Sequence, residues 1–514
     1  MIKVTDAIER HPAGMFLAFL ALHALVWSVL PALFFLNLPL DLIEGLLYGR
    51  EWQLGYDKLP PLPWWLLAAT YRLFGPDLFF YVLAQAFVVA AFALVWVMAR
   101  RLVGPVGALV AVLIIDAQFY FTYTAPKFNH DVAQLPFWAL TGYAYWAALR
   151  QGRSVHWALL GFAVGMSFWA KYFAVVQVAP LMLFGLVDRD ARRALLTPGP
   201  WIGVAVALLV LSPHLIWLFQ NDFLPLSYAE ARASTFKKAL DYATKPSRFV
   251  LAQLLFLLPS LIIAAAYLRR DVRVPEPSGQ SRPDAFDRRI VTLLAFAPAV
   301  TIVLLSIGTG RDTIDLWGYP LWLFLGLWIV LNARSLERIT LWRIVFLWAV
   351  FFVGTAGLFA FGHGALPRFK LTYSAILYPG DRLGTEISRR FRNLVGRPLA
   401  YVVAPMWEGG NVAHYSPEHP RVLIDDSARR APWIDLGDLR AKGAVLIWPH
   451  DHYRPGPPPE YRDLAEDAEV QPALTLPMRL GTGTVQIGWA LLRPRPVIAG
   501  QQANRSAAPP KPAP

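Results

Sequence analysis

The sequence predicts a polytopic α-helical membrane protein with a small α/β domain outside the membrane, and three observations carry that prediction. Hydrophobic residues make up 56% of the 514-residue chain, and a mean hydropathy of +0.42 excludes an ordinary soluble globule. Apolar runs long enough to cross a bilayer recur as far as residue 361, and the sequence after them is mixed and polar. Much of the Lys and Arg behind the net charge of +13 lies in short loops between these runs, so nucleic acid is not an expected partner.

About eleven membrane spans are expected if each takes about 17–25 apolar residues. They cover residues 14–36, 78–99, 105–123, 132–149, 155–171, 173–187, 201–219, 249–268, 290–307, 316–331 and 341–361. The two runs between 155 and 187 are short and could instead form one shallow hairpin. No small-residue cleavage site follows the first run, so that run is expected to remain as an anchor.

Arginine clusters give the expected orientation, because loops rich in Lys and Arg stay in the cytoplasm. They fall on alternate loops, at Arg100-Arg101, Arg150 and Arg153, Arg189 with Arg192-Arg193, Arg269-Arg270 through Arg288-Arg289, and Arg334 with Arg338. The N-terminus is therefore expected in the cytoplasm of a cell whose inner membrane the chain crosses. The loops expected on the periplasmic side are 40–77, 124–131, 220–248 and 308–315, together with everything after residue 362.

Three domains follow from these patterns: a transmembrane domain over 1–362, a periplasmic α/β domain over 363–497 and a disordered Pro/Ala-rich tail over 498–514. Short β-rich runs at Leu399–Val403, Val422–Ile424 and Ala444–Trp448 predict the strands of the second domain.

Cysteine is absent, which excludes disulfides, thiolate metal sites and cysteine nucleophiles.

The first outer loop concentrates charged and aromatic residues. Asp41 and Glu44 share one face of a short amphipathic helix with Tyr48, and leucines and an isoleucine cover its other side. Asp57 and Lys58 then lie on a turn stiffened by Pro60-Pro61. These carboxylates either face a cavity at the membrane surface or belong to a surface loop whose charges merely avoid lipid.

The other outer loops contain basic residues, although Lys and Arg usually gather in cytoplasmic loops. Membrane topology therefore does not explain them. Arg232, Lys237, Lys238, Lys245 and Arg248 lie in one such loop, and Arg311 lies in the next. Either they meet an anionic head group, or they pair with Asp222, Glu230 or Asp241.

Asp116 lies inside the third expected span, where an ionisable residue is either functional or paired, an outer-face lysine being its expected partner. His23 in the first span is interpreted as a tolerated lining residue.

The outer residues suit transfer of a group from a phosphate leaving group to a hydroxyl. A carboxylate can accept the proton of the attacking hydroxyl, and lysine or arginine can stabilise charge on the departing phosphate. The sequence has no glycine-rich nucleotide loop and no His-Glu-x-x-His helix, so an activated substrate must bring its own leaving group. A lipid-linked substrate would keep its chain in the bilayer while its phosphate meets the basic residues.

The order of five motifs over residues 10–330 resembles family 39 of the GT-C glycosyltransferases, which include protein O-mannosyltransferases and the aminoarabinose transferases of lipid A. The motifs are Asp41 with Glu44, Tyr56-Asp57-Lys58-Leu59-Pro60-Pro61-Leu62, His130-Asp131, Ala170-Lys171-Tyr172, and Arg311 through Tyr319-Pro320. Two motifs depart from the family pattern: Leu42-Ile43 separates the acidic pair, and Tyr172-Phe173 stands where Gly-Pro is usual.

The resemblance implies transfer of one sugar, with inversion, from a polyprenyl-phosphate donor to a lipid A, lipopolysaccharide-type or other envelope acceptor on the periplasmic face. It implies Asp41 as the base, with Glu44 and Asp131 as further catalytic candidates. It maps donor phosphate to Lys58, Lys171, Arg311 and Tyr56. Further pocket positions are expected at Asp116, His130, Tyr172 and Tyr319.

A divalent metal ion stays open as a cofactor. Asp57, Asp131 and His214 would be its ligands, and charge pairing of Asp57 with Lys127 or Lys58 is the alternative.

A transporter or flippase of a lipid-linked saccharide is the alternative function. Such proteins tend to show internal repeats and broken helices at the bilayer midplane, whereas here the ionisable residues gather at one face and no repeat stands out. An envelope scaffold is a third hypothesis.

Overall fold

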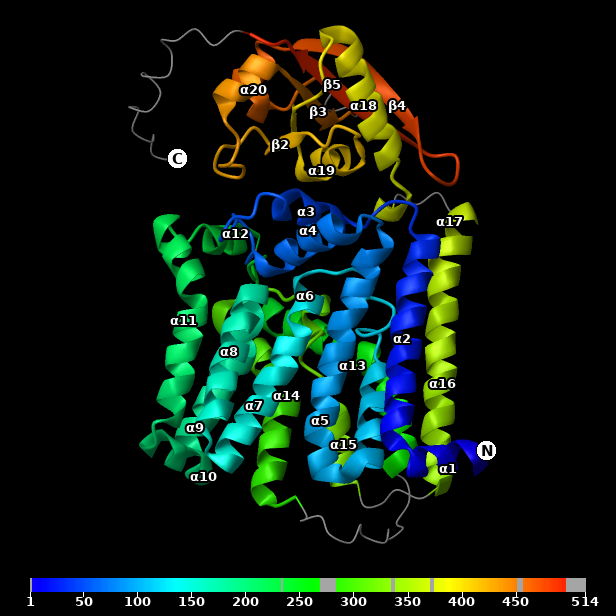
Figure 1. Ribbon diagram of the computed structural model, residues 1–514, viewed down its shortest axis with the longest axis vertical. Coiled ribbons are helices and arrows are strands. Elements are labelled where there is room, and N and C mark those ends of the chain that lie inside the picture. Colours follow the sequence, from blue (N-terminus) through cyan, green and yellow to red (C-terminus); the bar gives the residue numbers. More distant parts are fainter. Residues whose placement is uncertain are drawn as a thin grey trace. The chain divides into compact units, whose positions relative to one another are not determined.

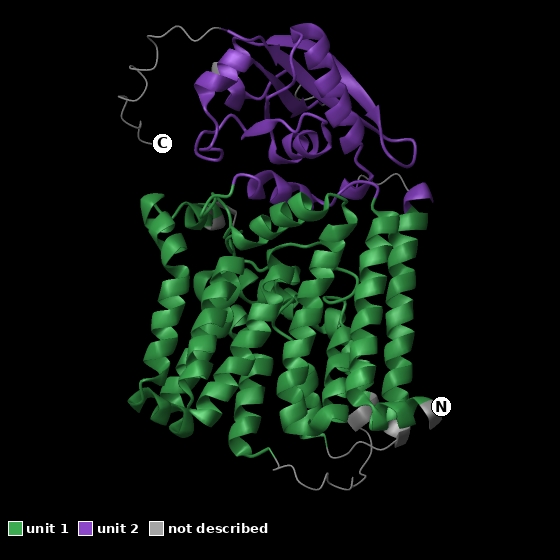
Figure 2. Cartoon of the chain, viewed as in Figure 1, with its two compact units in different colours: residues 1–35, 52–366 green, residues 36–51, 367–514 purple. Residues whose placement is uncertain are grey.

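The chain folds into two compact units, which Figure 2 shows in different colours. Unit 1 comprises Met1–Phe35 and Trp52–Leu366, and unit 2 comprises Leu36–Glu51 and Pro367–Pro514. The computed structural model describes residues 2–232, 234–268, 283–333, 338–369, 374–450 and 456–495. The expected disordered tail and the arginines at 269, 270 and 334 lie outside these residues.

Unit 1 is a helical bundle, in which Figure 1 shows α4 and α12 toward one end and α1 and α10 toward the other. Its α-helices are α1 (Ile2–Arg10), α2 (Pro12–Phe34), α4 (Leu62–Phe74), α5 (Leu78–Asp116), α6 (His130–Ala133), α7 (Leu135–Gln151), α8 (Ser154–Ala170), α9 (Val175–Val187), α10 (Arg189–Arg192), α11 (Gly199–Gln220), α12 (Leu224–Arg232), α13 (Asp241–Leu268), α14 (Ala285–Thr309), α15 (Leu325–Asn332) and α16 (Arg338–Ala360). Shorter turns are η1 (Tyr172–Ala174), η2 (Arg193–Leu196), η3 (Asp315–Gly318) and the π-helical η4 (Phe361–Ala365), and the unit boundary crosses α17 (Leu366–Phe369).

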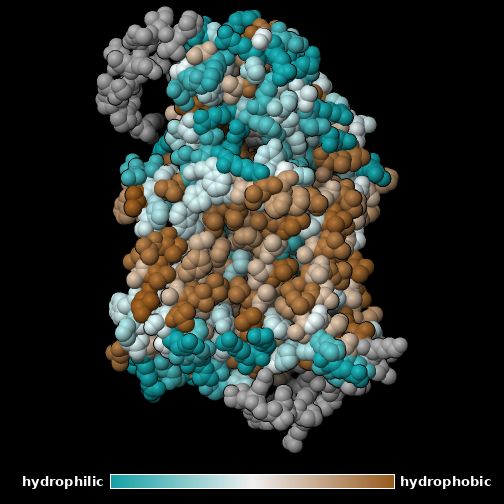
Figure 3. Space-filling model, in the orientation of Figure 1, coloured by the Kyte–Doolittle hydropathy of each residue, from teal (hydrophilic) through white to brown (hydrophobic). Residues whose placement is uncertain are grey.

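Six helices of the described residues are long and apolar enough to cross a membrane, or seven if the bent pair at Tyr172–Val187 and Arg189–Leu196 is one span. They are Pro12–Phe34, Leu78–Asp116, Gly199–Gln220, Asp241–Ala265, Ala285–Thr309 and Leu341–Phe369. Large apolar side chains on these helices are exposed, among them Leu209 at 73% and Val353 at 68%. On the face shown in Figure 3, hydrophobic side chains gather over the long helices of unit 1, as a multi-pass membrane protein requires.

The count of eleven expected spans is not confirmed. The expected spans 78–99 and 105–123 fall on the two parts of α5, which is broken at Gly104, where φ is 73° and ψ is 169°. The expected span 316–331 begins as the 3-10 turn η3 and reaches α-helical geometry in the eight residues of α15 alone. Eight helical residues rise about 12 Å, which is too short to cross a bilayer.

Asp116 pairs with residues of the bundle interior, so the expectation of an outer-face lysine partner is wrong. Its carboxylate lies 2.7 Å from His23 Nδ1 and accepts a hydrogen bond from Trp348 Nε1 at 2.6 Å. His23 Nε2 lies 3.1 Å from the side-chain oxygen of Gln85. Asp116 and His23 are fully buried, so this network joins α2, α5 and α16 where an isolated charge would be costly.

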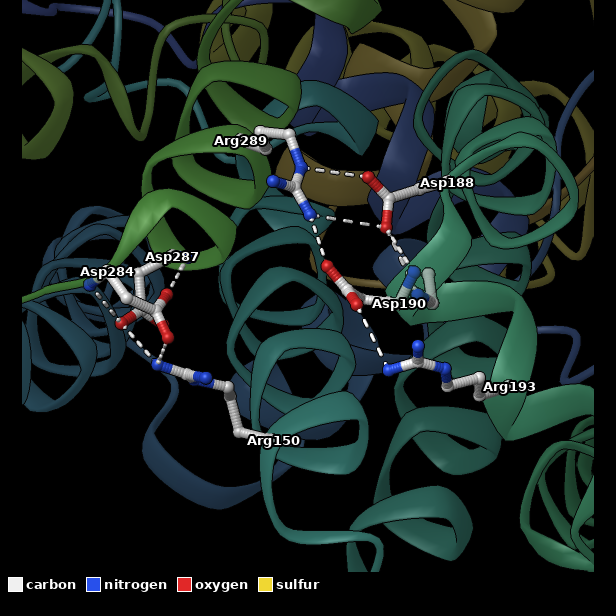
Figure 4. A network of polar contacts seen from close by, with 8 residues as sticks. Arg150, Asp188, Asp190, Arg193, Asp284, Asp287 and Arg289 are labelled. Atoms are coloured by element: carbon white, nitrogen blue, oxygen red, sulfur yellow. Dashed lines mark hydrogen bonds and ion pairs between the residues drawn. The ribbon is translucent and has the colours of Figure 1, made fainter.

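A second polar network joins α7, α10 and α14 (Figure 4). Asp287, which is 3% exposed, accepts hydrogen bonds from Trp146 Nε1 at 2.8 Å and from Arg150 at 2.7 Å. Asp284 caps α14 and also binds Arg150, at 2.8 Å. Arg289 binds Asp188 at 2.8 Å and Asp190 at 2.7 Å. Contacts between helices distant in sequence thus hold this end of the bundle together.

Unit 2 is a five-stranded mixed sheet with helices packed on it. Its strands are β1 (Tyr401–Ala404), β2 (Arg421–Ile424), β3 (Ala444–Pro449), β4 (Glu469–Pro477) and β5 (Thr484–Leu492), in the order β2-β1-β3-β5-β4. β1 runs parallel to β2 and β3, whereas β5 runs antiparallel to β3 and β4. Its helices are α3 (Leu40–Gly49), η5 (Ala375–Leu377), α18 (Gly380–Val395), α19 (Met406–Tyr415), α20 (Leu436–Lys442), η6 (Pro459–Tyr461) and α21 (Arg462–Ala465).

The sheet confirms the three expected strand runs within a few residues and adds two that the sequence reading missed. β4 contains Pro472 and an irregular register between Gln471 and Leu474, which breaks the alternation that signals a strand. Ile487 and Trp489 of β5 pack with Leu383 and Phe391 of α18 in the core of the unit. This core allows unit 2 to present α19 and the strand ends rigidly.

Replacing Asp287 with Ala should lower stability by about 1–3 kcal/mol, because it leaves the buried Trp146 N–H without an acceptor. Thermal unfolding of the detergent-solubilised chain measures the loss. Asp190→Ala is the matched control: its carboxylate is 47% exposed, so its removal should cost at most about 1 kcal/mol. Equal losses for the two variants would contradict the role given to Asp287.

Burial in the first turn of α19 raises the pKa of Glu408 from 4.5 to about 7, and Asp425 adds to the rise. Between these values the folded chain binds more protons than the unfolded chain, so stability falls as pH rises from 4.5 to about 7 and levels off above it. The full difference corresponds to about 3 kcal/mol. Glu408→Gln should therefore lose much of the fall in thermal stability between about pH 5 and pH 8, whereas exposed Glu460→Gln should keep it. An unchanged pH profile in Glu408→Gln would refute this assignment.

Candidate functional site

The Lys-x-Pro-Pro loop in unit 1 is held by aromatic residues. Tyr56 packs edge-to-face on Trp64 at 4.9 Å between ring centroids, and its hydroxyl accepts a hydrogen bond from the Gln53 N–H at 3.1 Å. The Nζ atom of Lys58 lies 5.4 Å above the ring of Tyr228 in α12. The loop is therefore pinned on both sides of Asp57, whose side chain is buried to 8% exposure.

His130 binds this loop to the start of α6. Its Nε2–H donates to the Pro60 carbonyl at 3.0 Å, and Trp64 packs edge-to-face on its ring at 5.0 Å. The Asn129 side chain caps α6 by accepting from the N–H groups of Asp131 and Val132. Burial lowers the pKa of His130 to about 3, so this histidine is neutral at physiological pH and acts as a hydrogen-bond donor to the loop.

Asp131 and Lys171 form a short ion pair. Lys171 Nζ lies 2.5 Å from Asp131 Oδ1, and the two side chains are 11% and 15% exposed. Lys171 is the extended residue at which α8 ends, and its Nζ also lies over the rings of Phe173 at 5.5 Å and Trp317 at 6.0 Å. The pair therefore places a cation beside η3, in surroundings with little solvent screening.

His214 on α11 joins the first loop to the α8–α9 break. Its Nδ1 is 2.7 Å from the Leu54 carbonyl, which can accept only, so Nδ1 carries the proton. Its Nε2 is 2.8 Å from the hydroxyl of Tyr172 and accepts from it. A Cβ atom at Gly55 would lie 2.1 Å from the Trp217 ring, so the loop backbone rests directly on α11.

Arg311 lies beside α13 and beside α12, the helix that also carries Tyr228 under Lys58. It meets Glu230 at 3.4 Å, while Lys245 and Arg248 bind Asp312 at 3.0 Å and 3.1 Å. Pairing of these cations with nearby carboxylates is thus part of their role.

An apolar cavity of about 520 Å³ lies between α13 and α14 near this point, lined by Tyr242, Pro246, Val250, Leu254, Val303 and Ile307. The hydroxyl of Tyr242 faces Gly310, the neighbour of Arg311, because a Cβ there would lie 2.8 Å from it. The basic residue Arg311 and this apolar cavity therefore lie next to each other.

Tyr319 lies in the interior next to Tyr120, with ring centroids 5.1 Å apart. The Tyr120 hydroxyl donates to Gln253 at 2.7 Å and contacts the Asp315 carbonyl at 2.8 Å. A side chain on Gly318 would collide with both Gln253 and Tyr120. Tyr319 thus belongs to the support of η3.

Asp41 and Glu44 lie on α3 in unit 2 and are both half-buried. Asp41 lies in the first turn of that helix, and the sequence predicts a helix here.

The expected metal ligands do not fit a metal ion as they are arranged. Both ring nitrogens of His214 already have partners, and Asp131 Oδ1 binds Lys171 and Gln134. Among the described residues, no three His, Asp or Glu side chains form a group that could hold a metal ion.

The sequence reading missed several residues that build this site. Tyr228 contacts Lys58, Trp317 contacts Lys171 and Trp217 contacts Gly55. Trp217 follows His214 by three residues, so helical spacing could have indicated it. Tyr228 carried no such signal, because its partner is distant in sequence.

Residues 58–217 match the model of the dolichyl-phosphate-mannose-protein mannosyltransferase family. This range contains Lys58, His130, Asp131, Lys171 and His214. This part of the chain is therefore similar to that family. The resemblance seen in the sequence is confirmed.

Two curated relatives represent the similarity. The lipopolysaccharide core galacturonosyltransferase RgtA of Rhizobium johnstonii is 26% identical over 461 residues, covering 85% of this chain and 86% of the relative. The undecaprenyl phosphate-alpha-4-amino-4-deoxy-L-arabinose arabinosyl transferase of Pseudomonas paraeruginosa is 30% identical over 187 residues, covering 33% of each chain.

A solved structure shows the same fold. ArnT from Cupriavidus metallidurans, determined with undecaprenyl phosphate bound, superposes with a TM-score of 0.60 at 13% identity, covering 93% of this chain and 98% of ArnT. At this identity the likeness concerns the fold.

Proposed function

We propose that this protein is a bacterial inner-membrane glycosyltransferase that moves one sugar from a polyprenyl-phosphate donor to a lipid A or lipopolysaccharide-type acceptor at the periplasmic face. The family domain and the similarity to sugar transferases of lipopolysaccharide support the reaction class. The fold shared with ArnT supports a donor carried on a polyprenyl phosphate.

The observation that carries the proposal is the joining of three of the sequence motifs with His214 within unit 1. The Lys58–Pro61 loop is bound by His130, the next residue Asp131 binds Lys171, and the following Tyr172 binds His214, which returns to Leu54 of the same loop. Such a closed set of contacts holds the cations Lys58 and Lys171 on rigid supports. Rigidly placed cations stabilise charge that develops on a leaving phosphate more than mobile ones do.

In this mechanism Lys58 and Lys171 bind donor phosphate, with Tyr56 as a hydrogen-bonding neighbour. Asp131 orients Lys171, because their pair leaves the lysine with one defined direction. Arg311 provides a further positive charge, and the apolar cavity near it suits a lipid chain.

Asp41 is the proposed base, with Glu44 as an assisting carboxylate. The acceptor hydroxyl attacks the anomeric carbon and gives its proton to Asp41 as the new C–O bond forms. The bond between that carbon and the phosphate oxygen breaks on the opposite side, so the configuration inverts. The departing polyprenyl phosphate gains one negative charge, which the lysines stabilise.

The sugar we would assay first is galacturonic acid. RgtA and RgtB, two core galacturonosyltransferases of Rhizobium johnstonii, match 85% and 81% of this chain. An anionic donor sugar also agrees with the basic outer loop between residues 237 and 248.

Asp41→Asn should abolish release of polyprenyl phosphate from a purified enzyme given labelled donor and a lipid A acceptor, because the amide cannot take the proton. Losing general-base catalysis typically costs about 10²–10⁴-fold in rate. Glu460→Gln, which neutralises an exposed carboxylate of the same unit, should keep full activity. Vectorial movement of the donor without bond cleavage would instead support the transporter, and undiminished release by Asp41→Asn would refute the assigned base.

Lys58→Ala should impair use of the donor far more than use of the acceptor, because the proposed partner of this lysine is donor phosphate. We expect an increase of about tenfold or more in the KM for donor, and a change within about twofold for acceptor, measured at saturating co-substrate. Lys58→Arg keeps the charge and should recover part of the loss. Equal impairment for both substrates contradicts the role.

A further inference from the structure

The segment that bears Asp41 is built into unit 2, although more than 300 residues separate it from the rest of that unit. α3 lies between two anchors, one before its first turn and one after its last. Each anchor uses side chains of the C-terminal α/β fold. The position of the proposed base is therefore set by residues from the far end of the chain.

The first anchor is a buried amide pair. The Asn37 side chain donates to Asn411 Oδ1 at 3.1 Å and to the Ala375 carbonyl at 3.3 Å. The two side chains are 3% and 0% exposed. The Asn37 N–H also donates to the Ile376 carbonyl at 3.0 Å, and the Leu38 N–H donates to the Tyr415 hydroxyl at 3.0 Å. Buried hydrogen bonds of this kind specify one geometry, because an unmade bond there is costly.

The second anchor is a set of charged contacts at the start of β2, which we call the clasp. Arg421 reaches Glu51 through two nitrogens, at 2.6 Å and 3.4 Å, and the Glu51 side chain is 9% exposed. The neighbouring Arg50 donates to the carbonyls of Pro420 at 3.0 Å and His419 at 2.9 Å. A two-pronged guanidinium contact carries more directional information than a point charge.

Between the anchors, α3 packs directly on α19. A Cβ atom at Gly410 would lie 2.5 Å from Ile43 Cγ2 and 3.7 Å from Leu47, so the two helices touch at this glycine. Tyr48 packs edge-to-face on Trp433 at 6.0 Å. The apolar side of α3, formed by leucines and an isoleucine, thus includes a face that contacts protein.

We infer that unit 2 fixes the position of the proposed base Asp41, with Arg421 and Asn411 as positioning residues. This inference rests on the proposed function. Asp41 lies four residues after the first anchor and ten before the second, on a helix of ten residues. Loosening either anchor lets that helix shift, and a misplacement of about 1 Å can cost about 10²-fold in rate.

The test is a double-mutant cycle in the full-length enzyme, using Glu51→Gln, Arg421→Gln and the double variant. Arg421→Gln should lower kcat about ten- to hundredfold while the KM for donor changes within about twofold, because donor phosphate is bound elsewhere. The double variant should recover part of the loss, since it removes the buried carboxylate that the single variant leaves without its arginine. Amide hydrogen exchange in residues 40–49 should speed up in Arg421→Gln.

Arg493→Gln is the matched control, because Arg493 pairs with Glu469 in the same unit and both side chains are about half exposed. It should leave kcat and exchange in α3 unchanged. If Arg421→Gln fails to give monodisperse protein, Arg421→Lys replaces it, keeping the charge but losing the two-pronged contact. The lysine variant should lose about three- to tenfold in kcat with faster exchange in α3.

Two outcomes overturn the inference. Unchanged kcat with a raised KM for acceptor would make the clasp part of acceptor binding, and unchanged kinetics with faster α3 exchange would make it purely structural. Failure of the proposed function is recognised separately, by an Asp41→Asn variant that still transfers sugar.

Discussion

The pairing of buried charge governs how unit 1 is built. A lysine that is largely shielded from solvent must be held and partly neutralised, and Asp131 does this for Lys171 at 2.5 Å. The same requirement explains the His23, Asp116 and Trp348 network deeper in the bundle. In both places an ionisable group is joined to partners from other helices, so charge pairing and helix packing become one constraint.

The contacts of the first loop follow from this need to pair charges and pack helices together. Prolines stiffen the first loop, and its carbonyls at Leu54 and Pro60 are bound by His214 and His130 respectively. Neutral histidines suit this task, because each can offer one N–H to a carbonyl without adding charge beside Lys58 or Lys171. The histidines therefore fix the position of the first loop, and the lysines bind the phosphate in the proposed reaction.

Unit 2 holds the short helix α3 in place, and it does so with an ordinary α/β fold. Its parallel strands place α19 against α3, and the glycine at 410 allows the contact to be close. A short helix such as α3 is only marginally stable by itself in water. Packing on a folded domain, with a hydrogen-bonded anchor at each end, removes that weakness and gives the Asp41 carboxylate a defined place within its unit.

The sequence by itself determined the membrane class, the GT-C resemblance, the helix bearing Asp41 and three of five strands, because these depend on composition, local order and periodicity. It could not determine the partner of Asp116, the pairing of Lys171 with Asp131, or the aromatic contacts of Lys58, since each joins residues from separate elements. It also missed the break of the expected span 316–331 and the attachment of α3 to unit 2. Only the tertiary structure decided these, because long-range packing selects among partners that local sequence leaves equivalent.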